Sequence, residues 1–109
     1  MDAVALLRLI SHPTKHGILQ ALRRGEQGVS GLVEITGAQQ SNVSHQLRTL
    51  RDAGLVRVRA VGRERRYRLA DPELRRLLEQ VDALAQRLEQ VAYYSGLELP
   101  LEPGFHGYG

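Results

Sequence analysis

The sequence contains no cysteine among its 109 residues. This absence excludes disulfides, thiolate metal sites and thiol-based redox sensing. No apolar run approaches the roughly 18 residues that a membrane-spanning helix needs, so no such helix is expected. The N-terminus also lacks the basic region and long apolar run of a secretory signal. We therefore expect a soluble, cytoplasmic protein.

Aromatic residues are scarce, at 5% of the chain, although hydrophobic residues make up 42%. The core must therefore consist mainly of Leu, Val, Ile and Ala side chains. A chain of this length forms one compact domain, which we place at residues 1–95, and a small aliphatic core is often completed by a second subunit. Residues 96–109 contain four Gly and two Pro and are predicted to form a flexible tail.

The centre of the chain, residues 39–51, has the pattern of a helix with two different faces. Val43, Leu47 and Leu50 recur at spacings of four and three and share one side. The other side carries polar side chains that can form hydrogen bonds with base edges. These are Gln40, Ser41, Asn42, Ser44, His45 and Arg48. A shorter helix ends just before, at Gly37, and the pair predicts a helix-turn-helix whose second helix enters the major groove. The alternative is a solvated amphipathic helix.

Three helices are predicted ahead of this stretch. The first covers residues 2–10 and is apolar enough to be mostly buried. The second starts at Pro13, which fits a first helical position, and runs to about Arg24. Residues 25–28 are expected to form a loop, and Ser30 is expected to cap the third helix.

After Gly54, which suits a left-handed helix cap, the periodicity changes from helix to strand. Residues 55–69 alternate on both sides of a turn and predict a two-stranded hairpin, or wing. This segment holds six Arg against one Glu, a local charge of +5 that exceeds the +3 of the whole chain. Concentrated charge beside a polar helix is typical of contact with the phosphate backbone. We assign that contact to Arg63, Arg65 and Arg66. The alternative is an edge strand protected by charge against aggregation.

A long final helix is predicted from Asp71, which can cap it, and Pro72, which fits its first position. Its apolar residues follow spacings of three and four from Leu74 to Val91, which is a heptad stripe. About 20 helical residues span about 30 Å, more than so small a domain needs, so the stripe predicts a subunit interface shared with the first helix. The predicted interface residues are Leu6, Leu7, Leu77, Val81, Leu84, Leu88 and Val91. The alternative is that the stripe packs on its own domain.

The histidines give only weak metal candidates: His12, His16 and His106. His12 and His16 are four residues apart, a spacing that suits a metal pair on a helix. His12 directly precedes Pro13, however, and is better explained as a helix cap, so no metal or other cofactor is predicted. The sequence shows no Ser/His/Asp arrangement, phosphate-binding loop or pair of catalytic carboxylates, and the chain is therefore not expected to be an enzyme.

In order, these elements predict a mainly α fold with a small β-hairpin: four helices, two strands and a last helix. This is a winged helix-turn-helix, expected as a homodimer through its first and last helices. Residues 11–15, 41–47, 50–56, 62–63 and 67–71 carry a resemblance to the ArsR/SmtB family of bacterial winged-helix transcriptional regulators. The resemblance implies a homodimer that binds an imperfect palindrome in double-stranded DNA near a promoter. In that family the usual action is repression, relieved when a metal ion or another effector binds.

The chain departs from this family at both of its usual sensing sites. Gly28 and Ser30 stand where members with a thiolate site carry Cys. Asp71 and Glu73 stand at the start of the other site, and two carboxylates without imidazole hold a transition metal poorly. The later ligand positions of that site fall at about Leu84 and Arg87. Control by a partner protein or another effector is therefore expected.

Three functions stay open at this point. The first is a DNA-binding regulator controlled by an effector or a partner protein. The second is a dimeric protein-interaction module that has lost DNA binding, and the third is a metal-responsive regulator with a rearranged His site. A salt titration separates the first two, because a protein with several Arg–phosphate contacts loses affinity steeply as salt rises.

Overall fold

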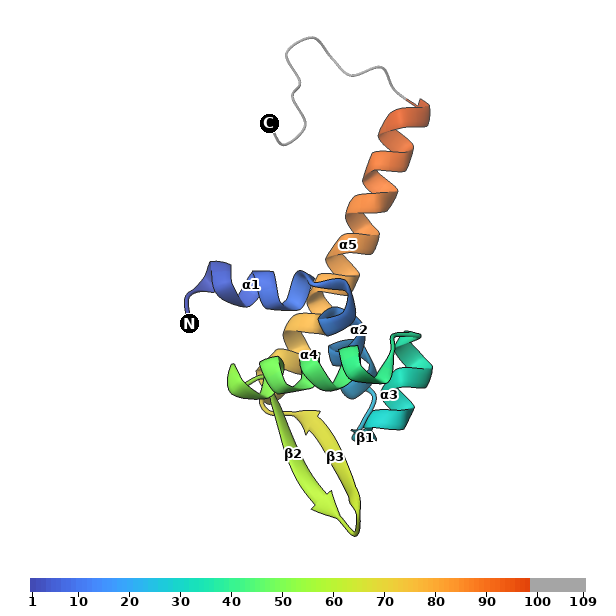
Figure 1. The fold of residues 1–109 in the computed structure, drawn as a ribbon. Helices are drawn as coiled ribbons and strands as arrows, with labels where there is room; N and C mark the ends of the chain where they lie inside the picture. The colour runs from blue at the N-terminus through green and yellow to red at the C-terminus, as the bar shows by residue number, and fades with distance from the viewer. Residues whose placement is uncertain (99–109) are drawn as a thin grey trace. The chain divides into compact units, whose positions relative to one another are not determined.

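The computed structural model describes residues 1–98, and side chains as far as Tyr93. Five helices and three short strands follow one another in this part of the chain (Figure 1). Their bounds are α1 Ala3–Ser11, α2 Pro13–Arg23, β1 Gln27–Gly28, α3 Val29–Thr36, α4 Gln40–Asp52, β2 Val56–Val61, β3 Glu64–Leu69 and α5 Pro72–Glu98. The chain divides into two compact units, residues 1–78 and residues 79 onward, and α5 contributes to both. None of the helices described here is both long and apolar enough to span a membrane.

Three helices are capped at their N-termini by side chains that accept hydrogen bonds from free backbone N–H groups. Asp2 accepts from Ala5 at 2.8 Å, and Asp71 accepts from Glu73 at 2.9 Å. His12 Nδ1 accepts from the N–H of Lys15 at 3.3 Å, which confirms its assignment as a helix cap. The cap predicted at Ser30 is wrong. Helix α3 begins at Val29, with Gly28 at the cap position two residues before the predicted one, so that Ser30 lies inside its first turn.

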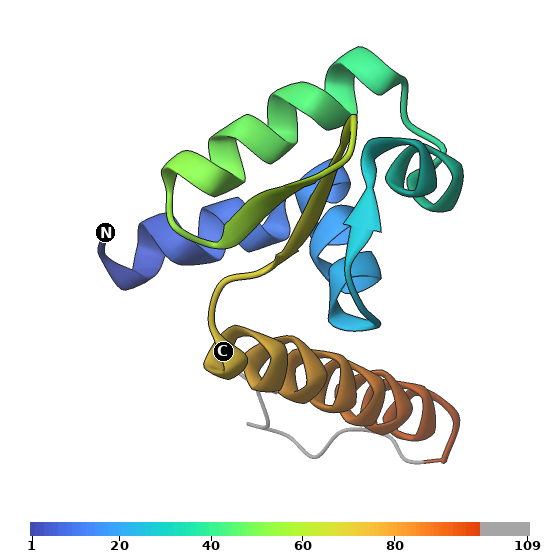
Figure 2. The same ribbon diagram turned by 90° about the horizontal axis from the view of Figure 1, so that it is seen from below.

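The first unit, residues 1–78, is built around α2, which packs against α1, α3, α4 and β3 (Figure 2). The three apolar residues predicted for the inner face of α4 are all buried, with 0–1% of their surface exposed. Its core holds aliphatic side chains and one tyrosine, as the composition predicted: Ile10, Ile18, Leu19, Ala21, Leu22, Leu32, Val43, Leu47, Leu50, Val56, Tyr67, Leu74 and Leu78. Burial of this apolar surface is what holds the helix-turn-helix together.

The sheet is antiparallel with strand order β1-β3-β2. Strands β2 and β3 form the predicted wing, in which Val58 pairs with Tyr67 and Arg59 with Arg66. Residues 25–28 were expected to be a loop, but Gln27 and Gly28 pair with β3 and form a third strand. Two residues are too few for any alternation to show in the sequence, so only the pairing itself reveals β1.

The two terminal helices differ from their predictions. Helix α1 was expected to be mostly buried, but Ile10 is its one buried residue, and the Leu7 side chain is 56% exposed. Helix α5 continues to Glu98, whereas the regular pattern was expected to end near residue 95. The remainder of the predicted tail, with His106, lies outside the described residues.

The beginning of the α5 stripe packs on its own unit, in contrast to the predicted subunit interface. Leu74 and Leu78 are buried in the core, and Leu77 is half-buried against it. Leu78 was not part of the predicted stripe. Leu74 and Leu78 thus pack within their own unit, as the alternative had it, whereas the interface role of the half-buried Leu77 stays a prediction. Leu6, another predicted interface residue, is also half-buried against the core.

Candidate nucleic-acid interface

Helix α4 presents its polar face to solvent. The side chains on that face are all exposed: Gln40, Ser41, Asn42, Ser44, His45 and Arg48. Burial of Val43, Leu47 and Leu50 on the opposite side sets this rotation of the helix. The face therefore offers hydrogen-bonding groups of the kinds that recognise base edges in a major groove.

A tight turn orients α4 relative to α3. Gly37 ends α3 with φ 72°, a left-handed conformation that strains residues with a side chain. Thr36 Oγ1 donates to the carbonyl oxygen of Leu32 at 2.7 Å and accepts from the N–H of Ala38 at 3.2 Å. Gly37 was predicted from the sequence but Thr36 was not, because a threonine at a helix end has no distinctive pattern. Together Thr36 and Gly37 fix the turn between α3 and α4, and so the direction in which α4 presents its polar face.

Asn42 has a second role that the sequence did not reveal. Its Nδ2 donates to Thr14 Oγ1 on α2 at 3.4 Å, and its Oδ1 accepts from Gln46 Nε2 at 3.0 Å. Gln46 is 7% exposed, so this short chain of hydrogen bonds leads from the surface into the unit. Asn42 therefore helps to hold α4 against α2, and a substitution there would alter both the helix position and the exposed face.

The pleat of the wing separates its arginines onto two faces. Neighbouring residues of a strand point to opposite sides, and directly paired residues share a side. Tyr67 is buried on the core side, so Arg65, two residues away, lies on that side of the sheet. Arg66 lies on the outer side with its partner Arg59. Arg63 follows Gly62, which has φ 60°, in the turn at the tip, and both Arg63 and Arg65 are exposed.

The outer face of the wing contains an ion-pair cluster centred on Glu26. Arg59 donates to the two carboxylate oxygens of Glu26, from Nε at 2.6 Å and from Nη2 at 2.8 Å. Arg66 Nη2 donates to the Glu26 carbonyl oxygen at 3.2 Å, and Arg66 Nη1 lies 3.3 Å from Glu64 Oε1. The hydrogen bonds from Arg59 hold the pKa of the Glu26 carboxyl below its ordinary value, and the same contact raises the pKa of Arg59.

This cluster distinguishes Arg66 from Arg63 and Arg65, with which it was predicted to contact phosphates. Its guanidinium is shared between Glu26 and Glu64 on the other face of the hairpin. Its contact with phosphate stays a prediction, and the candidate interface is built on Arg63 and Arg65. Glu26 was missed because it lies 33 residues from Arg59, and no local pattern connects the two.

The two histidines with metal-pair spacing, His12 and His16, form hydrogen bonds with different partners. His12 caps α2, whereas the Nδ1 atom of His16 lies 2.8 Å from the carbonyl oxygen of Ile10. A carbonyl can only accept, so this nitrogen carries the proton. The other ring nitrogen of His16 lies 3.2 Å from Gln20 Nε2. Within residues 1–98, no three His, Asp or Glu side chains gather in a way that could hold a metal ion.

Comparison with known proteins gives concordant results. The model of the family described as "Bacterial regulatory protein, arsR family" matches residues 12–58. The HTH-type transcriptional regulator NmtR of Mycobacterium tuberculosis is 42% identical over 79 residues, which are 72% of this chain and 66% of NmtR. The biofilm growth-associated repressor of Agrobacterium fabrum is 32% identical over 83 residues, which are 76% of this chain and 71% of that protein.

Solved structures show the same relationship. The transcriptional repressor BigR from Xylella fastidiosa has a TM-score of 0.70 and 30% sequence identity, over 74% of this chain and 83% of that one. The chain spans slightly less than two thirds of NmtR, but it covers more than two thirds of the other two relatives. All three are named as regulators or repressors, in agreement with the prediction that the chain is not an enzyme. With its helix-turn-helix and wing, the chain belongs to the arsR family of bacterial regulatory proteins, which are winged helix-turn-helix transcriptional regulators.

Proposed function

We propose that this protein is a sequence-specific DNA-binding transcriptional regulator that binds a palindromic promoter site as a homodimer. The observation that carries the proposal is the exposed polar face of α4 beside the basic wing. Gln40, Ser41, Asn42, Ser44, His45 and Arg48 face the major groove in this proposal. Arg63 and Arg65 contact phosphates of the flanking backbone. Helix α4 recognises the base sequence of the DNA, whereas the wing supplies affinity that does not depend on that base sequence.

Exposed apolar side chains on two helices support the homodimer. On α1, Val4 is 58% and Leu7 56% exposed. On α5, the later residues of the stripe are 36–51% exposed: Val81, Leu84, Leu88 and Val91. Such a row of aliphatic side chains in water is typical of a subunit interface. A twofold dimer would present two recognition helices, and its binding site would then share that symmetry.

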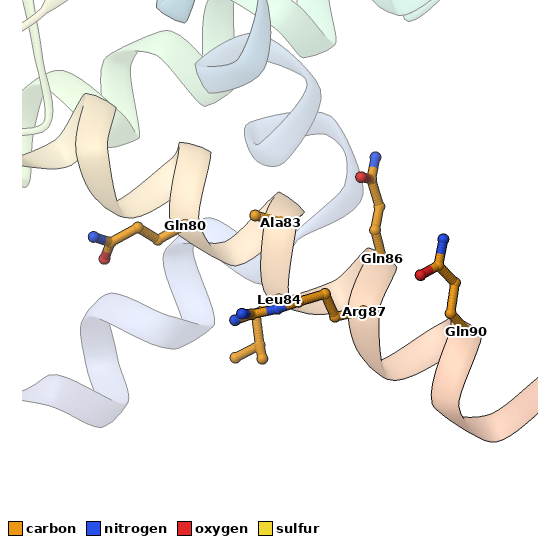
Figure 3. Close-up of a pocket in the computed structure, with 6 residues that line it drawn as sticks. All are labelled: Gln80, Ala83, Leu84, Gln86, Arg87 and Gln90. Carbon is orange, nitrogen blue, oxygen red and sulfur yellow. The ribbon is translucent and has the colours of Figure 1, made fainter. Parts of the chain in front are cut away.

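Figure 3 shows the directions of six α5 side chains in the second unit. Gln86 and Gln90 extend together in one direction, and Leu84 points away from them. These residues line a shallow concavity with Gln80, Ala83 and Arg87, all from the same helix. The exposed apolar residues of this part of α5 recur at spacings of three and four and so form a narrow strip, which supports pairing with one partner helix.

Two substitutions test the proposed contacts. Arg65→Ala should weaken binding to all duplexes alike and reduce the slope of log affinity against log salt by about 0.9, because one phosphate contact is lost.

Gln40→Ala should instead reduce discrimination between operator and variant duplexes by about 1–3 kcal/mol, because a base-edge contact is lost. Fluorescence anisotropy at several salt concentrations measures both effects. An Arg65→Ala protein with altered sequence preference but an unchanged salt slope would contradict the assignment of the wing.

We further propose that the usual metal sites of the family are absent and that control comes from a partner protein or another effector. Gly28, at one position of the usual thiolate site, has no side chain that could hold a metal ion. The positions near the other site hold Leu84 and Arg87, neither of which is a metal ligand.

The isolated protein should accordingly bind Zn²⁺ or Ni²⁺ weakly or not at all, and a chelator should leave its DNA affinity unchanged. A tight transition-metal site needs three or four correctly placed ligands. Isothermal titration calorimetry measures the binding, and anisotropy with and without chelator measures its effect on DNA. Stoichiometric binding with submicromolar affinity and a shift in DNA affinity would instead support the metal-responsive alternative, with His12, His16 and His106 as ligands.

A further inference from the structure

The outer face of the wing carries a block of like charges. The strand register places Arg57 opposite Arg68 and Arg59 opposite Arg66. Directly opposed residues of an antiparallel pair have Cβ atoms only about 4.5–5.5 Å apart, and like charges at that separation destabilise the pairing. Four guanidinium groups on one face of a two-stranded ribbon therefore tend to separate β2 from β3 unless a counter-charge lies between them.

Glu26 supplies that counter-charge from outside the hairpin. It directly precedes β1, and the strand order β1-β3-β2 puts β3 between Glu26 and its partner on β2. The Glu26 carboxylate nevertheless receives both hydrogen bonds from Arg59 on β2 and lies 4.0 Å from Arg66 Nε on β3. The Glu26 side chain is 24% exposed and the Arg59 side chain is 61% exposed, so solvent screens part of their attraction and the geometry of the forked contact matters more than the charge alone.

The backbone of Glu26 adds a further tie. Its carbonyl oxygen accepts from Arg66 Nη2 at 3.2 Å, so main chain and side chain of one residue contact both strands of the wing. Planar guanidinium groups suit such paired contacts, because their N–H donors are fixed in a fork. Glu26 thereby links the segment that leads into the helix-turn-helix to the hairpin that lies 30 or more residues later in the chain.

We propose that Glu26 is a positioning residue for DNA binding. It neutralises Arg59 and Arg66, holds the wing in place beside α4, and so presents Arg63 and Arg65 to phosphates without contacting DNA itself. This inference rests on the proposed function. A simpler role, in which Glu26 only offsets positive charge, gives the opposite prediction. Removal of the Glu26 charge would then leave Arg59 and Arg66 available to DNA phosphates and strengthen DNA binding.

The two roles are separated by Glu26→Gln, with Glu64→Gln as the matched control. Both variants remove one negative charge next to Arg66. Only Glu26→Gln also replaces one of the two oxygens that accept the forked contact of Arg59 with an NH2 group, which cannot accept it. Anisotropy is measured on the duplex that in vitro selection returns for the native chain. Glu26→Gln should bind it roughly three- to tenfold more weakly than Glu64→Gln, at an unchanged salt slope. Arg59→Lys, which keeps the charge and loses the fork, should also weaken binding.

Amide hydrogen exchange of the free variants provides a readout that does not depend on DNA. Residues 56–61 and 64–69 should exchange faster in Glu26→Gln than in Glu64→Gln, while the core of α2 stays protected. Tighter DNA binding by Glu26→Gln, with a steeper salt slope, would overturn the proposal in favour of simple charge compensation. Unchanged exchange in the wing would overturn it as well. Failure of the native chain to select any duplex would instead refute the proposed function.

Discussion

In the proposed homodimer, Leu84→Glu is expected to separate the two subunits and to lower DNA affinity by roughly two orders of magnitude or more. Leu84 is 47% exposed on α5 and lies in the middle of the exposed part of the stripe. In a twofold interface the substitution would bury a carboxylate from each subunit without a cationic partner. Loss of the dimer also removes the second recognition helix, so binding to a palindrome would fall with it. Sedimentation velocity at micromolar concentration and anisotropy measure the two effects.

Gln86→Glu is the matched control for this substitution. It introduces the same charge two residues away, on a side chain that extends away from Leu84 (Figure 3). The control should remain dimeric and bind DNA as the native protein does. A Leu84→Glu protein that also stayed dimeric would show that the exposed stripe of α5 has another use.

Leu50→Ala should lower the free energy of unfolding by about 2–5 kcal/mol, a large fraction of the stability of a small domain. The Leu50 side chain is 0% exposed and packs with Val43 and Leu47 beneath the polar face of α4. Its truncation removes buried apolar surface and leaves a cavity under the recognition helix. Urea denaturation monitored by circular dichroism measures the change.

The control for Leu50→Ala lies on the opposite side of the same helix. Ser44 is exposed, so Ser44→Ala should change stability by less than about 0.5 kcal/mol. Equal unfolding midpoints for the two variants would show that α4 is not held to the core by its apolar side. A reduction of DNA binding by Ser44→Ala without loss of stability would further separate the reading face from the packing face.

Local sequence patterns determined the parts of the fold that depend on neighbouring residues. The spacing of Val43, Leu47 and Leu50 predicted both the recognition helix and its buried face. Gly54, predicted as a left-handed cap, has φ 84°. The alternation after it predicted the wing, and the Asp71 cap predicted the start of α5. These signals are readable because helix period, strand alternation and capping act within a few residues.

Contacts between distant segments could be decided only by the tertiary structure. The strand at Gln27 exists because β3 pairs with it, and Leu78 is buried because the core of the first unit covers it. Arg66 was predicted as a phosphate contact from charge alone, but Glu26, 40 residues earlier, accepts its hydrogen bond. A sequence shows how much charge a hairpin carries. Which of those charges remain available to DNA depends on what the fold places beside them, because an ion pair requires proximity in space and not in the chain.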